Sequence, residues 1–189
     1  MEDTRIIQLF RDRSEQAIVE LAEKYGRLCC KVARNILRDV LDAEECVNDA
    51  YLGVWNSVPP QEPNPLGTYV CGITRNLALK KYHANTAQKR NSCYDAALEE
   101  LESCLAGPDT VEEAFSAQEL TELLNQFLAS LDQESRVLFV RRYWYADSIS
   151  AVAARLGMRD NQVSVRLHRL RSRLRSYLMK SANKKSIGK

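Results

Sequence analysis

The chain has 189 residues, with 27 basic and 25 acidic side chains, so its formal net charge is only +2. Hydrophobic residues make up 45% of it and charged residues 28%, which fits a soluble globular protein of one or two domains and excludes a disordered chain. No segment approaches the ~18 consecutive apolar residues that a membrane span requires. The first residues, MEDTRIIQLFRDR, contain no apolar secretory segment, so we expect a cytoplasmic protein that does not insert into membranes.

The first half of the chain has the hydrophobic period of helices. Apolar residues at three- and four-residue steps predict three helices, at about 14–38, 42–58 and 65–90. Ser14 is the predicted cap of the first helix, and Asp42, with Glu45 in capping-box position, is the predicted cap of the second. The proline-rich segment PPQEPNP (59–65) must separate the second helix from the third, because proline cannot continue a helix interior.

The second half is also predicted to be helical. After an acidic linker over 91–117, leucines from Leu120 to Leu128 mark an amphipathic helix, and Asp132 can cap another that reaches about Trp144. Shorter helices follow at about 148–155 and 159–178. The sequence therefore predicts an all-α chain. We expect two small helical domains, over residues 1–90 and 118–180. An acidic flexible linker over 91–117 would join them, and a disordered tail would follow over 181–189.

Charge is distributed in blocks. Residues 1–90 are nearly neutral, residues 91–135 carry 11 acidic side chains and no Lys or Arg, and residues 136–189 carry 14 basic and 2 acidic side chains. A basic block that coincides with an amphipathic helix is typical of a nucleic-acid-binding end. The acidic block is typical of a connector.

The segment SISAVAARLGMRDNQVSVRLHRLRSRLR (148–175) is the most informative motif. Ala153 is small where two helices must approach closely, and Gly157 can ease a tight turn, so the spacing matches a helix-turn-helix. On the second helix one stripe is apolar and a neighbouring stripe is polar and basic: Val163, Leu167, Leu170 and Leu174, then Gln162, Arg166, Arg169 and Arg173. Taken alone, the pattern also fits an arginine-rich solvated helix or a coiled-coil end.

Two polar groups stand out in the first half. Asp42, Glu45 and Asp49 share one helical face. No histidine joins them, so acid–base or metal chemistry has no support. The face could bind a basic partner, or its carboxylates could only cap the helix and face solvent. A basic run with tyrosines nearby could stack on unpaired bases, or could be a basic helix end whose tyrosines are core residues. That run contains Arg75, Asn76, Lys80, Lys81, Tyr82, Lys89 and Arg90, with Tyr69 upstream.

These blocks together resemble one family. DAEECVNDAYLGVWNSVP (42–59) and YVCGITRNLALKKYHANTAQKR (69–90) are similar to region 2, and residues 131–178 are similar to region 4, of bacterial RNA polymerase sigma factors of the extracytoplasmic-function (group 4, sigma-70-like) family. The resemblance implies a protein that binds core RNA polymerase, directs it to promoters through their −10 and −35 elements and assists promoter melting. It implies no catalytic residue, cofactor or metal.

The resemblance also implies roles for individual residues. Asp42, Glu45 and Asp49 would dock on the clamp helices of the largest polymerase subunits, and Trp55 would belong to the domain core. The expected −10 DNA-binding residues are Tyr69, Arg75, Asn76, Lys80, Lys81 and Tyr82, next to the 59–65 loop. The expected −35 DNA-binding residues are Arg159, Gln162, Ser164, Val165, Arg166, His168, Arg169 and Arg173. The acidic linker would pass through polymerase near the RNA exit path, and an anti-sigma protein would supply regulation.

Two other functions fit parts of the pattern. A stand-alone helix-turn-helix regulator would use residues 1–90 for dimerisation or ligand sensing and would bind a palindromic site without polymerase. A helical adaptor would bind polymerase or another partner without promoter selectivity. An enzyme fits least, because no nucleophile–base set, phosphate loop or metal cluster occurs in the sequence.

Overall fold

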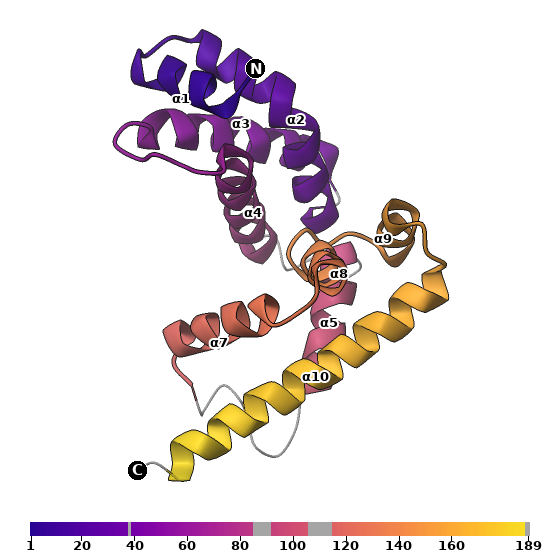
Figure 1. Cartoon of the computed structure of the whole chain (residues 1–189). Coiled ribbons are helices and arrows are strands. Elements are labelled where there is room, and N and C mark those ends of the chain that lie inside the picture. Colours follow the sequence, from indigo (N-terminus) through magenta and orange to yellow (C-terminus); the bar gives the residue numbers. More distant parts are fainter. Residues whose placement is uncertain (38, 85–91, 106–114, 188–189) are drawn as a thin grey trace. The chain divides into compact units, whose positions relative to one another are not determined.

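Figure 1 shows the computed structural model, which describes residues 1–37, 39–84, 92–105 and 115–187. Regular structure in these ranges is entirely helical, which confirms the all-α prediction. The chain divides into two compact units, Met1–Ser92 and Cys93–Lys189, so the division falls close to the predicted end of the first domain. In the described ranges, no helix has both the length and the apolar character needed to cross a membrane.

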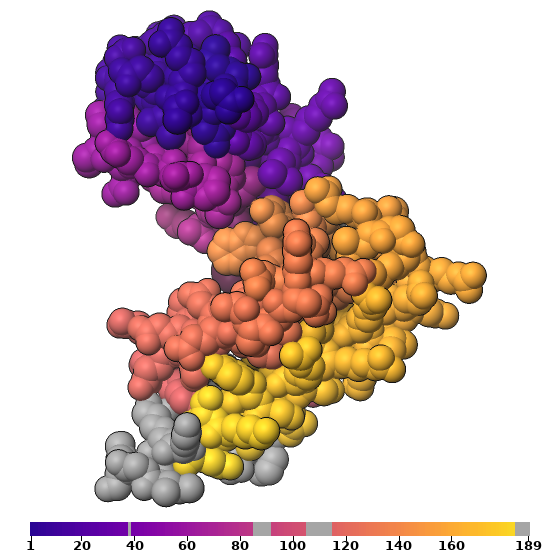
Figure 2. Space-filling model, in the orientation of Figure 1, coloured from indigo at the N-terminus to yellow at the C-terminus, as the bar shows by residue number. Residues whose placement is uncertain are grey.

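The N-terminal unit is a bundle of four helices. α2, α3 and α4 all pack against one another, and α1 packs on α2. Their bounds are Asp3–Arg11 (α1), Gln16–Ile36 (α2), Val40–Ser57 (α3) and Leu66–Ala84 (α4). The fully buried core residues come from every helix and include Ile6, Phe10, Leu21, Val32, Val54, Leu66 and Val70. Burying each such side chain contributes about 1.5–3 kcal/mol, so this core holds the unit together. Figure 2 shows the surface of this unit in indigo to magenta.

Three details of this unit differ from the sequence prediction. Helix α1 was not predicted. Helix α2 begins after Glu15 without a side-chain cap, so Ser14 does not cap it. The cap of α3 is Asp39 and not Asp42, because the Asp39 carboxylate accepts hydrogen bonds from the backbone N–H groups of Leu41 (2.8 Å) and Asp42 (2.9 Å). Asp42 therefore lies inside the first turn, where the helix dipole still favours a carboxylate.

The C-terminal unit contains five described helices. They are Cys93–Leu105 (α5), Ala117–Ala129 (α7), Gln133–Tyr143 (α8), Ile149–Leu156 (α9) and Asp160–Ile187 (α10). Helix α10 packs on α5, α7, α8 and α9, so it is the central helix of the unit. Its predicted apolar stripe is buried as expected, and the stripe extends one step further to Leu178.

Capping side chains set the starts of three of these helices. Ser116 and Glu119 form a capping box at α7, the predicted cap Asp132 accepts from the backbone N–H of Ser135 at α8, and Ser148 caps α9. Gly157 follows α9 with φ +64°, the left-handed conformation that favours glycine, and α10 begins shortly after it. The structure therefore has the helix, tight turn and helix that the 148–175 motif predicts.

The flexible acidic linker expected over 91–117 is not confirmed. Residues 93–105 form α5, which packs against α8 and α10, and Ala97 is buried in the core of the C-terminal unit. The GPD turn at 107–109 lies outside the described residues. The predicted disordered tail also differs, because α10 continues to Ile187.

One acidic side chain explains why α5 packs there. The Glu100 carboxylate accepts hydrogen bonds from Arg142 (2.7 Å), Arg171 (2.8 Å) and the Tyr143 hydroxyl (3.0 Å), so it joins α5 to α8 and α10. Arg142 is only 3% exposed, and it also donates to the backbone carbonyl of Asp147 (2.9 Å). Burial raises the pKa of Tyr143, and the negative charge of Glu100 adds to this, so the phenol remains a donor at neutral pH.

Candidate protein and nucleic-acid interfaces

The predicted acidic face lies on the outer side of α3. Asp42 is half-buried, while Glu45 and Asp49 are exposed. The Lys81 ammonium of α4 lies between the first two, 2.8 Å from the Asp42 carboxylate and 2.6 Å from that of Glu45. These hydrogen bonds raise the pKa of Lys81, which stays charged. Part of the acidic face is therefore neutralised within the unit, and Asp49 is the member that forms no ion pair with a described residue.

Two leucines complete this face, and sequence reasoning missed them. Leu41 is 75% exposed and Leu52 is 56% exposed, the highest values among the large apolar side chains that the structure describes. Both lie on the same side of α3 as Glu45 and Asp49, because their spacing corresponds to about three helical turns. Exposed leucines among carboxylates are typical of a surface that docks on an amphipathic, basic partner. Their spacing from Glu45, four residues before it and seven after it, could have predicted that both leucines lie on the acidic face.

The predicted −10 residues are divided between two sides of α4. Asn76 and Lys80 are exposed and lie one helical turn apart, so these two share the outer side, while Arg75 is half-buried. Lys81 faces α3 instead, where it forms the ion pairs with Asp42 and Glu45. The structure therefore brings together only part of the predicted set. Lys89 and Arg90 lie outside the described residues.

The two predicted stacking tyrosines also have partners within the fold. The Tyr69 hydroxyl donates a hydrogen bond to the Ser57 hydroxyl (2.9 Å), which ties the start of α4 to the end of α3. The rings of Tyr82 and His83 meet edge to face with centroids 5.4 Å apart. Both tyrosines are half-buried, so each leaves part of its ring accessible. Trp55, expected in the core, is also half-buried.

On α10 the predicted −35 residues lie mainly on the side away from the core. All are exposed except Ser164, which is half-buried, and they surround an exposed apolar residue, Val165 (49%). Three of these residues already have internal partners. Gln162 accepts from the backbone N–H of Arg159 (2.9 Å), the Ser164 hydroxyl donates to the Asp160 carbonyl (3.0 Å), and Arg166 pairs with Glu134 (2.8 Å).

The remaining side chains form the accessible basic surface. The side chains of Arg159, Val165, His168, Arg169 and Arg173 form no ion pair or hydrogen bond with a described residue. An exposed helix face with arginines and a small apolar residue suits the DNA major groove, where arginine pairs with guanine and an apolar group contacts the thymine methyl. Arg171, on the same helix, is not part of this surface because it binds Glu100.

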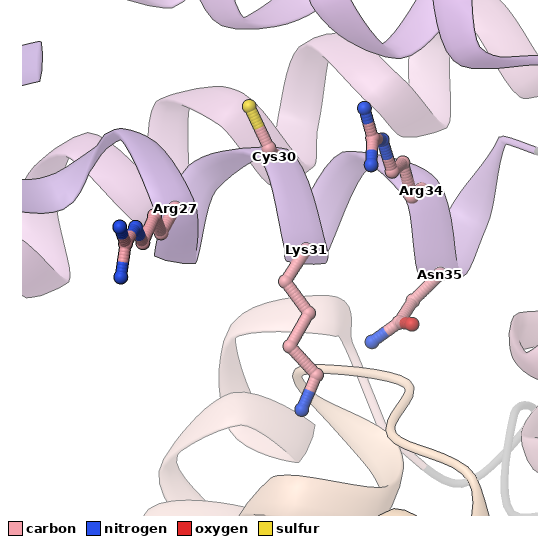
Figure 3. Close-up of a pocket in the computed structure, with 5 residues that line it drawn as sticks. All are labelled: Arg27, Cys30, Lys31, Arg34 and Asn35. Atoms are coloured by element: carbon pink, nitrogen blue, oxygen red, sulfur yellow. The ribbon is translucent and has the colours of Figure 1, made fainter.

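The structure has a shallow pocket elsewhere, on α2. Its lining residues are Arg27, Cys30, Lys31, Arg34 and Asn35; in Figure 3 Cys30 and Arg34 point above the helix and the other three below it. None of the predicted site residues belongs to it. Within the described ranges, no cluster of His, Cys, Asp and Glu is placed to hold a metal ion.

Comparison with known proteins identifies the N-terminal unit. Residues 21–88 match the family model described as sigma-70 region 2. This match contains α2 from Leu21 onward, all of α3 with its acidic and leucine face, and all of α4.

Two curated relatives extend the similarity along the chain. The "Probable RNA polymerase sigma factor RfaY" of Xanthomonas campestris pv. campestris is 26% identical, over 83% of this chain and 41% of that protein. The "ECF RNA polymerase sigma factor SigE" of Mycolicibacterium smegmatis is also 26% identical, over 87% of this chain and 62% of that protein. The chain thus matches less than two thirds of the length of either relative.

Among solved structures, CnrH in complex with the cytosolic domain of CnrY is similar, with 20% sequence identity and a TM-score of 0.44, covering 95% of this chain and 97% of that one. The family model agrees with the resemblance to region 2 drawn from residues 42–90, and the two relatives agree with the resemblance to RNA polymerase sigma factors. The chain therefore matches sigma-70 region 2 over residues 21–88 of its N-terminal unit, and most of its length is similar to two proteins described as RNA polymerase sigma factors.

Proposed function

We propose that this protein is a sigma factor that binds bacterial core RNA polymerase, directs it to promoters and assists melting of the −10 region. The single observation that carries the proposal is the sigma-70 region 2 match over residues 21–88, which contains the exposed acidic and leucine face of α3 and the basic outer side of α4. The helix-turn-helix of α9 and α10 supplies the second DNA contact.

The α3 face is the proposed polymerase-docking surface. Leu41 and Leu52 supply apolar anchors, and Glu45 and Asp49 supply negative charge between them. A buried apolar anchor with charges around it gives affinity and orientation together. We assign the polymerase clamp helices as the partner, as the family resemblance implies.

The outer side of α4 and the 59–65 loop are the proposed contact for the melted −10 strand. Arg75 and Lys80 would meet phosphates, Asn76 would contact a base edge, and the exposed ring edges of the tyrosines would stack on unpaired bases. Lys81 leaves this set, because its charge is paired with Asp42 and Glu45.

The adjacent lysines give a matched test of that assignment. We expect Lys80→Met to weaken the binding of holoenzyme to a pre-melted promoter probe by about fivefold, the loss of one phosphate contact, and Lys81→Met to change it less than twofold, to order of magnitude. Fluorescence anisotropy at several salt concentrations measures both, and the salt slope should fall by about one for Lys80→Met alone. Equal weakening by the two variants would contradict the assignment.

Helix α10 is the proposed −35 reader. Arg169→Ala and Arg166→Ala are each expected to cost about 1–3 kcal/mol of binding to a −35 element if they contact bases, and the Arg169 effect should be the larger because Arg166 must first leave Glu134. Glu134→Gln is the matched control. It removes the negative charge that pairs with Arg166 and leaves the Arg166 guanidinium in place. Binding to wild-type and mismatched −35 sequences measures the effect, and undiminished discrimination by Arg169→Ala would show that this residue does not read bases.

The proposal includes the setting in which the protein acts. It is a non-enzymatic, cytoplasmic transcription initiation factor whose partners are core RNA polymerase and promoter DNA. Because the family resemblance implies regulation by a separate protein, we include an anti-sigma factor among its partners. The acidic residues 91–135 would oppose non-specific DNA binding by the basic block that follows them.

Reconstitution with polymerase tests this function. The protein should co-elute with core RNA polymerase on gel filtration, and the complex should retain specific genomic fragments at a salt concentration where the protein alone retains none, because one helix-turn-helix makes few phosphate contacts. Specific retention by the protein without polymerase, at a palindromic sequence, would favour the stand-alone regulator. Co-elution without any selective retention would favour the adaptor.

A further inference from the structure

The loop between α3 and α4, residues 59–65, is closed at its base. The hydrogen bond from the Tyr69 hydroxyl to the Ser57 hydroxyl (2.9 Å) joins the two helices that the loop connects. Val58 and Pro63 are buried, while the other residues of the loop are exposed. The loop thus presents polar groups and prolines to solvent on a fixed base.

Helix α1 and the turn after it contact the chain just before this loop. The Arg13 guanidinium donates a hydrogen bond to the backbone carbonyl of Trp55 (2.6 Å) and lies 5.4 Å from the centroid of the Trp55 ring. The Phe10 ring meets the same indole edge to face, with centroids 6.1 Å apart. Arg13 has φ +53°, an uncommon conformation for a residue with a side chain, and these contacts hold it there.

Helix α1 also contacts the loop itself and binds a residue of α2. Arg11 forms an ion pair with Glu62 in the middle of the loop. At the other end of α1, the Asp3 carboxylate faces α2. Asp3 is itself held by Lys24 (2.7 Å) and by the Tyr25 hydroxyl (2.6 Å).

Tyr25, which binds Asp3, also packs closely against Gly67 in the first turn of α4. A side chain at Gly67 would place its Cβ 2.6 Å from the Tyr25 ring, so only glycine fits under the tyrosine that holds Asp3. Contacts from α1 and its following turn therefore reach the chain before and within the 59–65 loop, and Tyr25, which binds Asp3, lies against the chain just after it.

We propose that α1 is a positioning element that holds the 59–65 loop in the shape that receives an unpaired DNA base, with Arg11, Arg13 and Asp3 as its positioning residues. This inference rests on the proposed function. None of the three residues lies in the segment 21–88 that matches sigma-70 region 2, so the positioning element is an addition to the matched domain. Fixing a loop before binding removes the entropy cost of ordering it when the DNA arrives.

The exposed Arg11–Glu62 pair allows a test by charge exchange. Holoenzyme carrying Arg11→Glu or Glu62→Arg is expected to bind a promoter probe with its −10 segment unpaired by mismatches about fivefold more weakly than wild type, the size expected for one ion pair and its reversal. The exchanged double variant, Arg11→Glu with Glu62→Arg, should bind within about twofold of wild type. Affinity for core polymerase, measured in parallel, should not change in any of the three.

Arg34→Glu is the matched control. Arg34 forms an exposed ion pair with Glu44 that lies away from the loop, so its reversal should leave probe binding unchanged. The proposal is overturned if the single variants bind the unpaired probe as wild type does, if the exchange does not restore binding, or if polymerase affinity falls in step with probe affinity, which would show a purely structural role. If wild-type protein gives no polymerase-dependent probe binding at all, the proposed function itself fails.

Discussion

Glu100→Ala is expected to lower the free energy of unfolding of the C-terminal unit by about 3 kcal/mol, the scale seen when one partner of a buried ion pair is removed. The variant leaves two arginines, Arg142 and Arg171, without the carboxylate that both of them bind. Arg142 cannot turn to solvent without opening the core, because its guanidinium is buried and also donates to the Asp147 carbonyl. The Tyr143 hydroxyl loses its acceptor as well.

The two tryptophans allow this effect to be measured in one unit of the intact chain. Trp55 lies in the N-terminal unit and Trp144 in the C-terminal unit, so urea unfolding of a Trp55→Phe background reports the C-terminal unit by fluorescence. Glu102→Ala, an exposed acid on the same helix, is the matched control and should change stability by less than about 0.5 kcal/mol. Equal midpoints for Glu100→Ala and Glu102→Ala would show that α5 is not anchored through Glu100.

Charge reversal on α3 is expected to release core polymerase. The triple variant Asp42→Lys, Glu45→Lys and Asp49→Lys should weaken binding by more than about 100-fold, because three carboxylates that face a basic partner become three like charges. The change also places lysines beside Lys81, so some loss of stability in the N-terminal unit is expected.

The single variant Asp49→Lys separates binding from stability. Asp49 is exposed and pairs with no described residue, so its reversal should leave unfolding unchanged and still weaken polymerase binding by about tenfold. Glu23→Lys, an exposed acid on α2, is the control with the same change in net charge. Co-elution of the triple variant with core polymerase in wild-type amounts would remove α3 as the docking surface.

The helices and the buried stripe of α10 could be predicted because both depend on local periodicity. Val163, Leu167, Leu170 and Leu174 recur at helical steps, and the structure buries all four. Helix α1 escaped prediction because it is short, with only Ile6 and Phe10 buried. The Asp39 cap was missed because two aspartates stand close together and either can cap a helix.

The partners of charged side chains could not be predicted, because they come from distant parts of the chain. Glu100 stands in an acidic run that resembles a solvated linker, yet Arg142 and Arg171 reach it from other helices. Lys81 resembles a phosphate contact until the packing of α4 on α3 places it between two carboxylates. Such pairs depend on tertiary packing, which a residue type and its neighbours do not reveal.

The measurement that tests the central claim most directly is transcription of fragmented genomic DNA from the source organism by purified core polymerase, with and without this protein, followed by mapping of RNA 5′ ends. The proposed function predicts discrete start sites that appear only with the protein and share two upstream elements at −10 and −35. It also predicts that these starts disappear with the triple α3 variant. Absence of any protein-dependent start, with folded protein and active core polymerase, would contradict it.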